Sequence, residues 1–293
     1  MTGRVSVVIP TRNRSTMLMR LLTQLVNMIG GDLNEVIVVD NASTDDTREK
    51  IKEFPQINYI RNDVNRMSAP ARQQGWDAAT SKYVCFIDDD NVIENDTLSN
   101  LAEFMDANQD VGLCGPIQRR LSDGTIWCAG GRISQFLIVS YDREVDISKH
   151  KVLVDFQPNV FMVRSDLRDV GVHFDWQRFP HNWSEAEFGN QIRSVGSNVA
   201  TCTKSTVFHD IDYSGYFTRI NPTNIFDQAQ SRIMYRRVHA NKLLTWLVFL
   251  VAILPLSTLL LVVVARKRPD RRLLLRRYVE GTLCGLVSTL QRP

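Results

Sequence analysis

The sequence predicts an α/β fold: a mixed, Rossmann-like sheet with helices on both faces, followed by a C-terminal membrane helix or helices. The first observation is that short, fully apolar runs alternate with segments whose apolar residues repeat at helical spacing. Strands that are apolar throughout indicate a mainly parallel sheet covered on both faces. The second observation is that polar clusters follow three of these runs. The third is an uncharged segment at residues 243–265, long enough to cross a bilayer.

The first half of the chain reads as strand and helix in turn. Gly30 and Gly31 end the first helical pattern, Ser43 or Thr44 is placed to cap the second helix, and Pro70 suits the first turn of the third. The expected strands cover residues 5–9, 36–39, 57–60 and 84–87, and the expected helices cover 18–29, a segment ending near 54, and 70–79.

The second half has a mixed pattern. Gly130 and Gly131 predict a flexible turn between its short elements. We expect helices at 98–108 and 185–195, strands at 111–117 and 161–163, and a second, weaker apolar stretch at 278–290. The resulting domain prediction is a catalytic domain at 1–227, a basic amphipathic interfacial stretch at 228–242, a transmembrane segment at 243–265, and a basic tail with a short apolar or interfacial helix at 266–293.

Charge and cysteine content narrow the class of protein. Residues 232–293 hold 12 of the 35 Lys and Arg but 2 of the 32 Asp and Glu, so the basic character belongs to the tail and no nucleic-acid partner is expected. The five cysteines lack CxxC spacing, which argues against a zinc ribbon or a disulfide framework and favours a reducing compartment. The N-terminal residues show no signal-peptide pattern.

The topology of the apolar segment stays open. Trp246 and the basic residues 266–268 suit interfacial anchoring, but basic residues also precede the segment. A single span would place one basic cluster outside, against the positive-inside tendency, while Pro255 near the middle permits a re-entrant hairpin. We favour the span because the uncharged length fits the bilayer.

Polar clusters at the carboxyl ends of the strands predict a binding site along one rim of the sheet. The clusters are residues 10–13, Asp40 with Asn41, and Asp88 to Asp90. Adjacent carboxylates repel one another, and oxygen ligands suit Mg²⁺ or Mn²⁺ held with a substrate diphosphate. On an extended strand end, Asp88 and Asp90 would point the same way and share the ion, while Asp89 points elsewhere.

The order of these motifs resembles glycosyltransferase family 2 over roughly residues 4–240. The resemblance implies a GT-A fold and a DxD element in which Asp88 and Asp90 bind the metal. It also implies donor contacts from the opening loop and the second strand. The residues assigned to the nucleotide sugar are Pro10, Thr11, Arg12, Asn13, Asp40, Asn41, Arg72 and Asp89.

Two later residues complete the site that the resemblance implies. Glu185, in Trp-Ser-Glu-Ala-Glu at 183–187, stands where the family carries the general base, and His209 stands where relatives carry a histidine near the metal or diphosphate. Three positions depart from the family pattern: residues 66–68 lack the usual glycine, Gln73 replaces an asparagine, and Ser184 replaces a glutamate. No Gln-x-x-Arg-Trp motif is present, which favours addition of one sugar over polymerisation.

The expected enzyme is therefore a metal-dependent, inverting hexosyltransferase attached to the cell membrane, with its catalytic domain on the cytoplasmic side. Its donor would be a UDP- or GDP-hexose, with GDP-mannose among the candidates, and its acceptor a lipid-linked molecule at the membrane. Two alternatives remain: a haloacid-dehalogenase-like phosphatase that uses Asp88 as nucleophile, and a catalytically inactive membrane scaffold. Homo-oligomerisation is left open.

Overall fold

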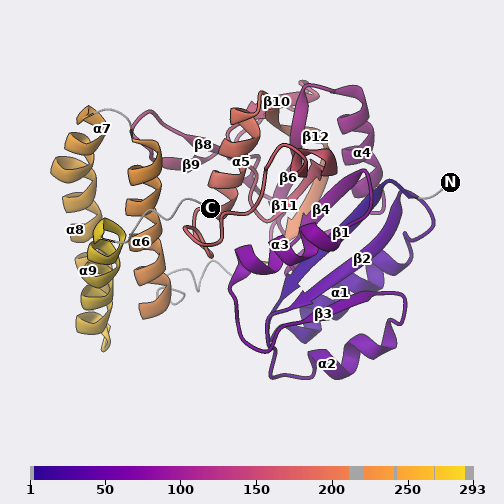
Figure 1. The fold of residues 1–293 in the computed structure, drawn as a ribbon, viewed down its shortest axis with the longest axis horizontal. Helices are drawn as coiled ribbons and strands as arrows, with labels where there is room; N and C mark the ends of the chain where they lie inside the picture. The colour runs from indigo at the N-terminus through magenta and orange to yellow at the C-terminus, as the bar shows by residue number, and fades with distance from the viewer. Residues whose placement is uncertain (1–2, 211–220, 241–242, 267, 288–293) are drawn as a thin grey trace. The chain divides into compact units, whose positions relative to one another are not determined.

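The computed structural model describes residues 3–210, 221–240, 243–266 and 268–287 (Figure 1). The chain divides into two compact units. The sheet unit contains residues 1–132, 140–176 and 184–211, and the helical unit contains 133–139, 177–183 and 212–293. The domain boundaries expected from the sequence stay a prediction.

The first half of the large sheet is parallel, as the sequence predicts. Its strands lie in the order β3-β2-β1-β4, with β1 pairing both β2 and β4 (Figure 1). The apolar runs of β1, β2 and β4 are buried, as expected for central strands covered on both faces, whereas β3 is a partly exposed edge strand. The strands are β1 (Val5–Thr11), β2 (Leu33–Asp40), β3 (Asn58–Arg61) and β4 (Tyr83–Ile87).

The second half makes the sheet mixed. β11 (Val160–Arg164) lies antiparallel between β4 and β6 (Val111–Arg120), and β12 (Asn198–His209) runs parallel to β6. The sequence pattern does not predict β12, because the middle of this strand is polar. Thr201 and Ser205 are nevertheless buried, and their hydroxyls donate hydrogen bonds to backbone carbonyls. Shorter strands are β5 (Asn91–Ile93), β7 (Ile126–Cys128) and β10 (Lys151–Val154) in the large sheet, and β8 (Gly131–Ile133) with β9 (Val139–Tyr141) in a separate pair.

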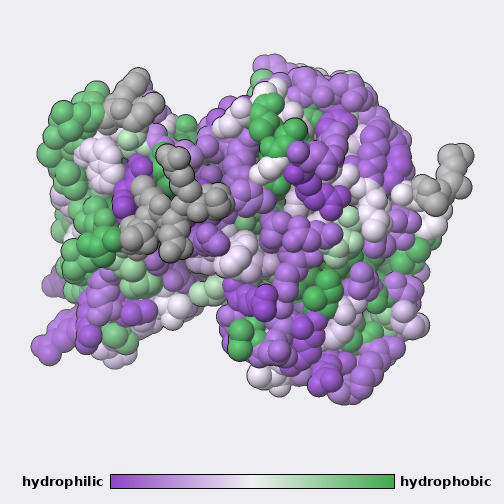
Figure 2. Space-filling view, viewed as in Figure 1, coloured by the Kyte–Doolittle hydropathy of each residue, from purple (hydrophilic) through white to green (hydrophobic). Residues whose placement is uncertain are grey.

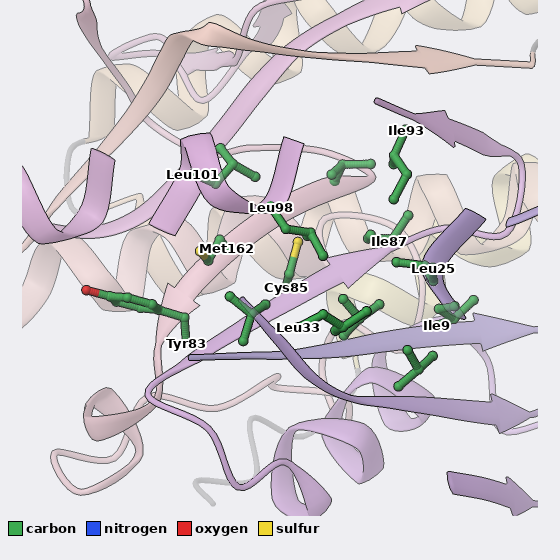
Figure 3. Close-up of a cluster of buried hydrophobic side chains, with 14 of the residues drawn as sticks. Ile9, Leu25, Leu33, Tyr83, Cys85, Ile87, Ile93, Leu98, Leu101 and Met162 are labelled. Atoms are coloured by element: carbon green, nitrogen blue, oxygen red, sulfur yellow. The ribbon is translucent and has the colours of Figure 1, made fainter. Parts of the chain in front are cut away.

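Helices cover both faces of the sheet. On one face, α1 (Ser15–Val26) and α4 (Thr97–Ala107) pack leucines against β1, β2 and β4 (Figure 3). On the other, α3 (Ser68–Ala78) and α5 (Ser184–Ser194) contribute Trp76 and Phe188. Each buried leucine contributes roughly 1.5–3 kcal/mol relative to an exposed one. A Cβ at Gly75 would lie 2.2 Å from the Val8 side chain, so only glycine lets α3 approach β1 this closely.

Two local predictions are wrong. The second helix is short, α2 (Thr47–Lys50) followed by a 3₁₀ turn (Ile51–Glu53), and neither Ser43 nor Thr44 caps it. The Ser43 hydroxyl instead accepts a bond from the Asn13 amide, because the two loops lie together. Gly130 and Gly131 do not form an open turn: both are buried, and a Cβ on either would overlap Val154 or Phe156.

The helical unit contains three helical segments. α6 (Pro222–His239) starts before the expected basic stretch, and α9 (Arg271–Val287) starts before the expected apolar one, of which residues 288–290 lie outside the described residues. Between them, α7 (Leu243–Val248), a π-helical turn (Phe249–Ile253) and α8 (Leu254–Ala265) make one helix of 23 residues. We call it the apolar helix. Its length, and a mean hydropathy of 3.0 over its most apolar 18-residue window, qualify it as a candidate membrane span.

Candidate active site

The three aspartates lie in a tight turn directly after β4. The Asn91 amide donates to the Asp88 carbonyl at 3.2 Å, which closes a turn with Asp89 and Asp90 at its tip. The expectation of an extended strand end with Asp88 and Asp90 side by side is therefore wrong. Within the turn, Arg72 binds Asp88, whereas Arg14 binds both Asp89 and Asp90.

Arg14 joins the second and third carboxylates. Its guanidinium donates to Asp89 and to Asp90, each at 2.9 Å, and the Thr11 hydroxyl donates to Asp89 at 2.7 Å. Burial raises the pKa of Asp89 to about 6, with Arg14 and Thr11 opposing the shift. Burial also acts to raise the pKa of Asp90, but His209 and Arg14 reverse it, and the net pKa lies below its usual value. Asp90 is therefore held ionised.

Arg72 joins the first carboxylate to Glu185. From the middle of α3, its two terminal nitrogens donate to Asp88 at 2.7 Å and to Glu185 at 2.6 Å. Arg72 is 2% exposed, so these bonds form away from bulk water. Burial and the neighbouring carboxylates Asp90 and Glu185 raise the pKa of Asp88 despite Arg72. The pKa of Glu185 is lowered because Arg72 outweighs the opposing effect of burial.

His209 lies at the end of β12 beside the turn. Its Nε2 is 3.2 Å from an oxygen of Asp90, its Nδ1 is 3.1 Å from the Asn159 amide nitrogen, and the Trp127 ring meets it edge-on. β12 pairs with β5, which follows the aspartate turn, and this pairing brings His209 opposite Asn91. The structure thus joins His209 to Asp90 across more than a hundred residues of sequence.

Asp40 and Asn41 hold neighbouring loops in place. Asp40 is fully buried; it accepts bonds from the Ser43 amide at 2.8 Å and from Tyr59 and Arg61 at 2.5 Å. The Asn41 side chain donates to the Met67 carbonyl at 2.7 Å. Both residues therefore shape the rim loops, and their contact with the nucleotide stays a prediction.

The opening loop contributes the other expected donor residues. Pro10 is half-buried in β1, and Arg12 is exposed and makes no hydrogen bond or ion pair with any residue that the structure describes. Asn13 has a φ of 52°, and its side chain accepts a bond from the Thr44 amide at 2.7 Å. Left-handed backbone is tolerated by asparagine better than by most residues. This geometry ties the loop after β1 to the loop after β2.

The predicted metal ligands are partly assembled. Over residues 3–210 and the later described segments, no group of three or more His, Cys, Asp and Glu side chains is placed to hold an ion. Asp90 and His209 touch, whereas Asp88 is turned to Arg72. The donor set nevertheless fits Mg²⁺ or Mn²⁺ in kind, because carboxylate oxygens predominate. The buried Asn91 amide oxygen next to them also lacks a hydrogen-bond partner within the described structure.

Sequence reasoning missed several residues of the site. Arg14, Tyr59 and Arg61 each contact a carboxylate that was predicted, and Asn159 supports His209. Arg14 follows the opening loop directly and could have been found, since a cation after one strand of a parallel sheet faces carboxylates after its neighbour. Asn159 carried no such signal because it lies in the bend before β11, outside the parallel strands whose ends form the rim.

Comparison with known proteins identifies the family of the chain. The sequence model of "Glycosyl transferase family 2" matches residues 6–171, which include the opening loop and the aspartate turn. A GalNAc(5)-diNAcBac-PP-undecaprenol beta-1,3-glucosyltransferase of Campylobacter jejuni is 33% identical over 105 residues, 34% of each chain. The abequosyltransferase RfbV of Salmonella typhimurium is 33% identical over 117 residues, 38% of this chain and 35% of the relative. The matches thus span about a third of these relatives.

Solved structures agree on the fold. A mannosyltransferase from Pyrobaculum calidifontis in complex with GDP-Man and Mn²⁺ has a TM-score of 0.59 at 19% identity, covering 99% of this chain and 88% of its own. GalNAc-T7 with UDP, GalNAc and Mn²⁺ has a TM-score of 0.64 at 14% identity, covering 78% and 47%. The family match covers more than half of the chain and leaves the phosphatase alternative without support. The chain belongs to glycosyl transferase family 2.

Proposed function

We propose that the protein transfers a single sugar from a nucleoside-diphosphate hexose to an acceptor hydroxyl, with inversion at the anomeric carbon. The observation that carries the proposal is the Arg72 bridge, which holds Asp88 of the DxD element and Glu185 two hydrogen bonds apart. Asp88 follows β4 and Glu185 lies on α5. Their proximity is what we expect of a site in which Asp88 serves the donor diphosphate and Glu185 serves the acceptor.

Glu185 is the proposed general base. Its lowered pKa keeps the carboxylate ionised near neutral pH and able to accept a proton. The acceptor oxygen forms a bond to the anomeric carbon as its proton passes to Glu185, and the bond from that carbon to the diphosphate oxygen breaks. Arg72 holds the base in position, and its positive charge would help to neutralise the leaving diphosphate.

A divalent cation would be held by Asp88 and Asp90, with His209 as a third ligand. Bound there, Mg²⁺ or Mn²⁺ would neutralise charge on the departing nucleoside diphosphate. The Arg14 guanidinium places a positive charge next to Asp89 and Asp90. Two structural neighbours hold Mn²⁺, one with UDP and one with GDP-Man, which supports both the metal and a UDP- or GDP-sugar donor.

A lipid-linked acceptor and attachment to the cytoplasmic face of the cell membrane complete the proposal. The undecaprenol-linked acceptor in the name of the Campylobacter relative supports it, as does the apolar helix on this chain. Nucleotide sugars are made in the cytosol, so the catalytic side would face it.

The test is transfer and hydrolysis across a panel of UDP- and GDP-sugars, with Mn²⁺, with Mg²⁺ and with chelator. One donor should be strongly preferred, and chelator should abolish its turnover. Asp90→Asn should lose the metal-dependent rate, and Glu185→Gln should lower the turnover rate by about 10²- to 10⁴-fold with donor binding retained. Glu53→Gln, on an exposed turn of the same unit, is the matched control and should be fully active.

Full activity of Asp90→Asn would contradict the metal role, and full activity of Glu185→Gln would contradict the base assignment. Nucleotide-sugar binding without turnover across many acceptors would instead favour the inactive scaffold.

A further inference from the structure

The outer surface of the apolar helix has no protein cover within the described structure. Ten of its leucine and valine side chains are between 44% and 76% exposed, and 6% of its most apolar window is buried. Figure 2 shows hydrophobic side chains gathered over this helix. α9 adds Val279 and Leu283, 52% and 55% exposed. An apolar surface of this extent on one unit indicates a docking site.

The inner surface of the same helix packs along α6 and α9. Near its start, Arg236 lies 4.2 Å from the ring centre of Phe249. Further along, the Ser257 hydroxyl is 2.8 Å from that of Tyr278, and Leu261 and Ala265 pack against Leu274. These contacts run from residue 249 to residue 265, about 24 Å at 1.5 Å per residue. α6 and α9 therefore accompany the apolar helix over most of its length.

This packing is incompatible with the apolar helix standing upright in a bilayer. Tyr278 touches Ser257 near the middle of the helix, and Arg276 is two residues from Tyr278. The Arg276 side chain is 76% exposed and forms an ion pair with Glu280 at 2.7 Å. An upright helix would carry this exposed Arg276–Glu280 pair to the depth of the hydrocarbon core, where charged side chains that face lipid are costly.

We propose that α6, the apolar helix and α9 form a monotopic unit that lies in the plane of the membrane, with its apolar surface sunk into one leaflet of an anionic bilayer. The proposal deepens the membrane attachment proposed above and replaces the transmembrane span expected from the sequence. An interfacial unit needs an apolar surface on one side and a charged surface on the other.

Charge complementarity selects anionic lipid. α9 exposes Arg271, Arg272 and Arg276, and Arg266 at the end of the apolar helix is exposed as well. Arginines at the edge of an apolar surface contact anionic headgroups when that surface enters the acyl region. The acidic side chains in the described part of the unit are Asp227, Asp270 and Glu280; Asp270 pairs with Arg268, and Glu280 pairs with Arg276 and Arg277, so basic residues remain in excess.

The binding test uses the purified full chain and vesicles of phosphatidylglycerol and phosphatidylcholine. The double variant Val251→Glu, Leu259→Glu should partition into anionic vesicles at least about tenfold less than the parent. Val170→Glu is the matched control: Val170 is 60% exposed, as Leu259 is, but lies in the sheet unit. It should bind as the parent does, and circular dichroism should show all three proteins folded.

Unchanged binding of the double variant would overturn the proposal, and so would equal binding to purely neutral vesicles. A second copy of the chain could cover the same surface instead. The membrane assignment would be contradicted if the parent formed a dimer without lipid and did not bind vesicles, and if the double variant abolished that dimer.

The orientation test labels single cysteines with a membrane-impermeant thiol reagent in sealed vesicles of one orientation from expressing cells. In a Cys284→Ser background, Lys52→Cys reports the sheet unit and Arg276→Cys reports α9. Lys52 and Arg276 side chains are 66% and 76% exposed, and the other four cysteines are buried. The monotopic arrangement predicts that both sites react or both are protected. Opposite behaviour would demonstrate a span. Neither test measures sugar transfer, so failure here is distinguishable from failure of the proposed activity.

Discussion

Arg72 in the sheet unit and Arg236 in the helical unit are buried to the same degree, 2% and 1% exposed, but their surroundings differ. Arg72 donates to two carboxylates, whereas Arg236 donates to the backbone carbonyls of Arg232, Phe136 and Leu137 and lies over the ring of Phe249. Arg72 lies between two carboxylates and balances the negative charges that the proposed reaction needs. A cation among carbonyls and an aromatic ring fastens helices together, and an apolar side chain could take its place.

The largest expected effect is that of Arg72→Met. It leaves Asp88 and Glu185 facing each other without a cation, and breaking a buried ion pair in this way costs about 3–5 kcal/mol. We expect the free energy of unfolding to fall by that amount in chemical denaturation at pH 8, and sugar transfer to be lost. Partial rescue at pH 5, where carboxylates begin to protonate, would support the cause. A loss of less than about 1 kcal/mol would show that the bridge is not a stabilising ion pair.

Arg14→Met should remove the cation from two carboxylates of the site, Asp89 and Asp90, and the effect can be followed at Asp89. Arg14 lowers the pKa of Asp89, which burial has raised to about 6, so its removal should move that pKa further up. Carbon-13 NMR titration of the Asp89 carboxyl measures this directly. Arg12→Met is the control, because Arg12 is on the same loop and is exposed. An unchanged pKa of Asp89 in Arg14→Met would contradict the contact.

Arg236→Met sharpens the comparison, since it repeats the Arg72 substitution where no carboxylate is left behind. Replacing a buried ion pair by apolar side chains is often neutral or stabilising, and Arg236 has no carboxylate partner among the described residues to offset the cost of burying its charge. We expect the unfolding free energy to stay within about 1 kcal/mol of the parent or to rise. A loss as large as that of Arg72→Met would mean that the carbonyl contacts of Arg236 matter as much as an ion pair.

The smallest effect is expected at Asp106, a partly exposed carboxylate that contacts Arg4, Lys82 and Tyr83. The pKa of Asp106 is lowered because hydrogen bonds and charge from Lys82 and Tyr83 outweigh the opposing effect of burial. A carboxyl with a lowered folded pKa stabilises the protein above its unfolded pKa, and this stabilisation is lost as the pH falls through the folded value. Asp106→Asn should therefore cost less than about 1 kcal/mol at pH 7, and nothing once the pH is well below 3.8. A cost that persists at low pH would point to packing.

The sequence predicted some regions of the fold and of the site better than others. The parallel strands around β1 were predictable because each is an uninterrupted apolar run, and their carboxyl ends fix one rim. β12 was missed since its buried Thr201 and Ser205 resemble loop residues until their carbonyl partners are known. The sequence motif revealed the three aspartates. It could not reveal that Arg14 binds two of them and Arg72 the third, because one arginine comes from a loop and the other from a helix.

The sequence by itself determined the strand–helix alternation, the acidic turn after β4, the apolar helix and the basic tail, because these depend on local pattern and length. Tertiary structure alone decided which charges meet. It joined Asp88 to Glu185 across 97 residues through Arg72 and placed His209 on Asp90. It also laid α6 and α9 along the apolar helix. Side chains far apart in the chain acquire neighbours only when the sheet pairs and the helices pack, and no local pattern encodes that contact.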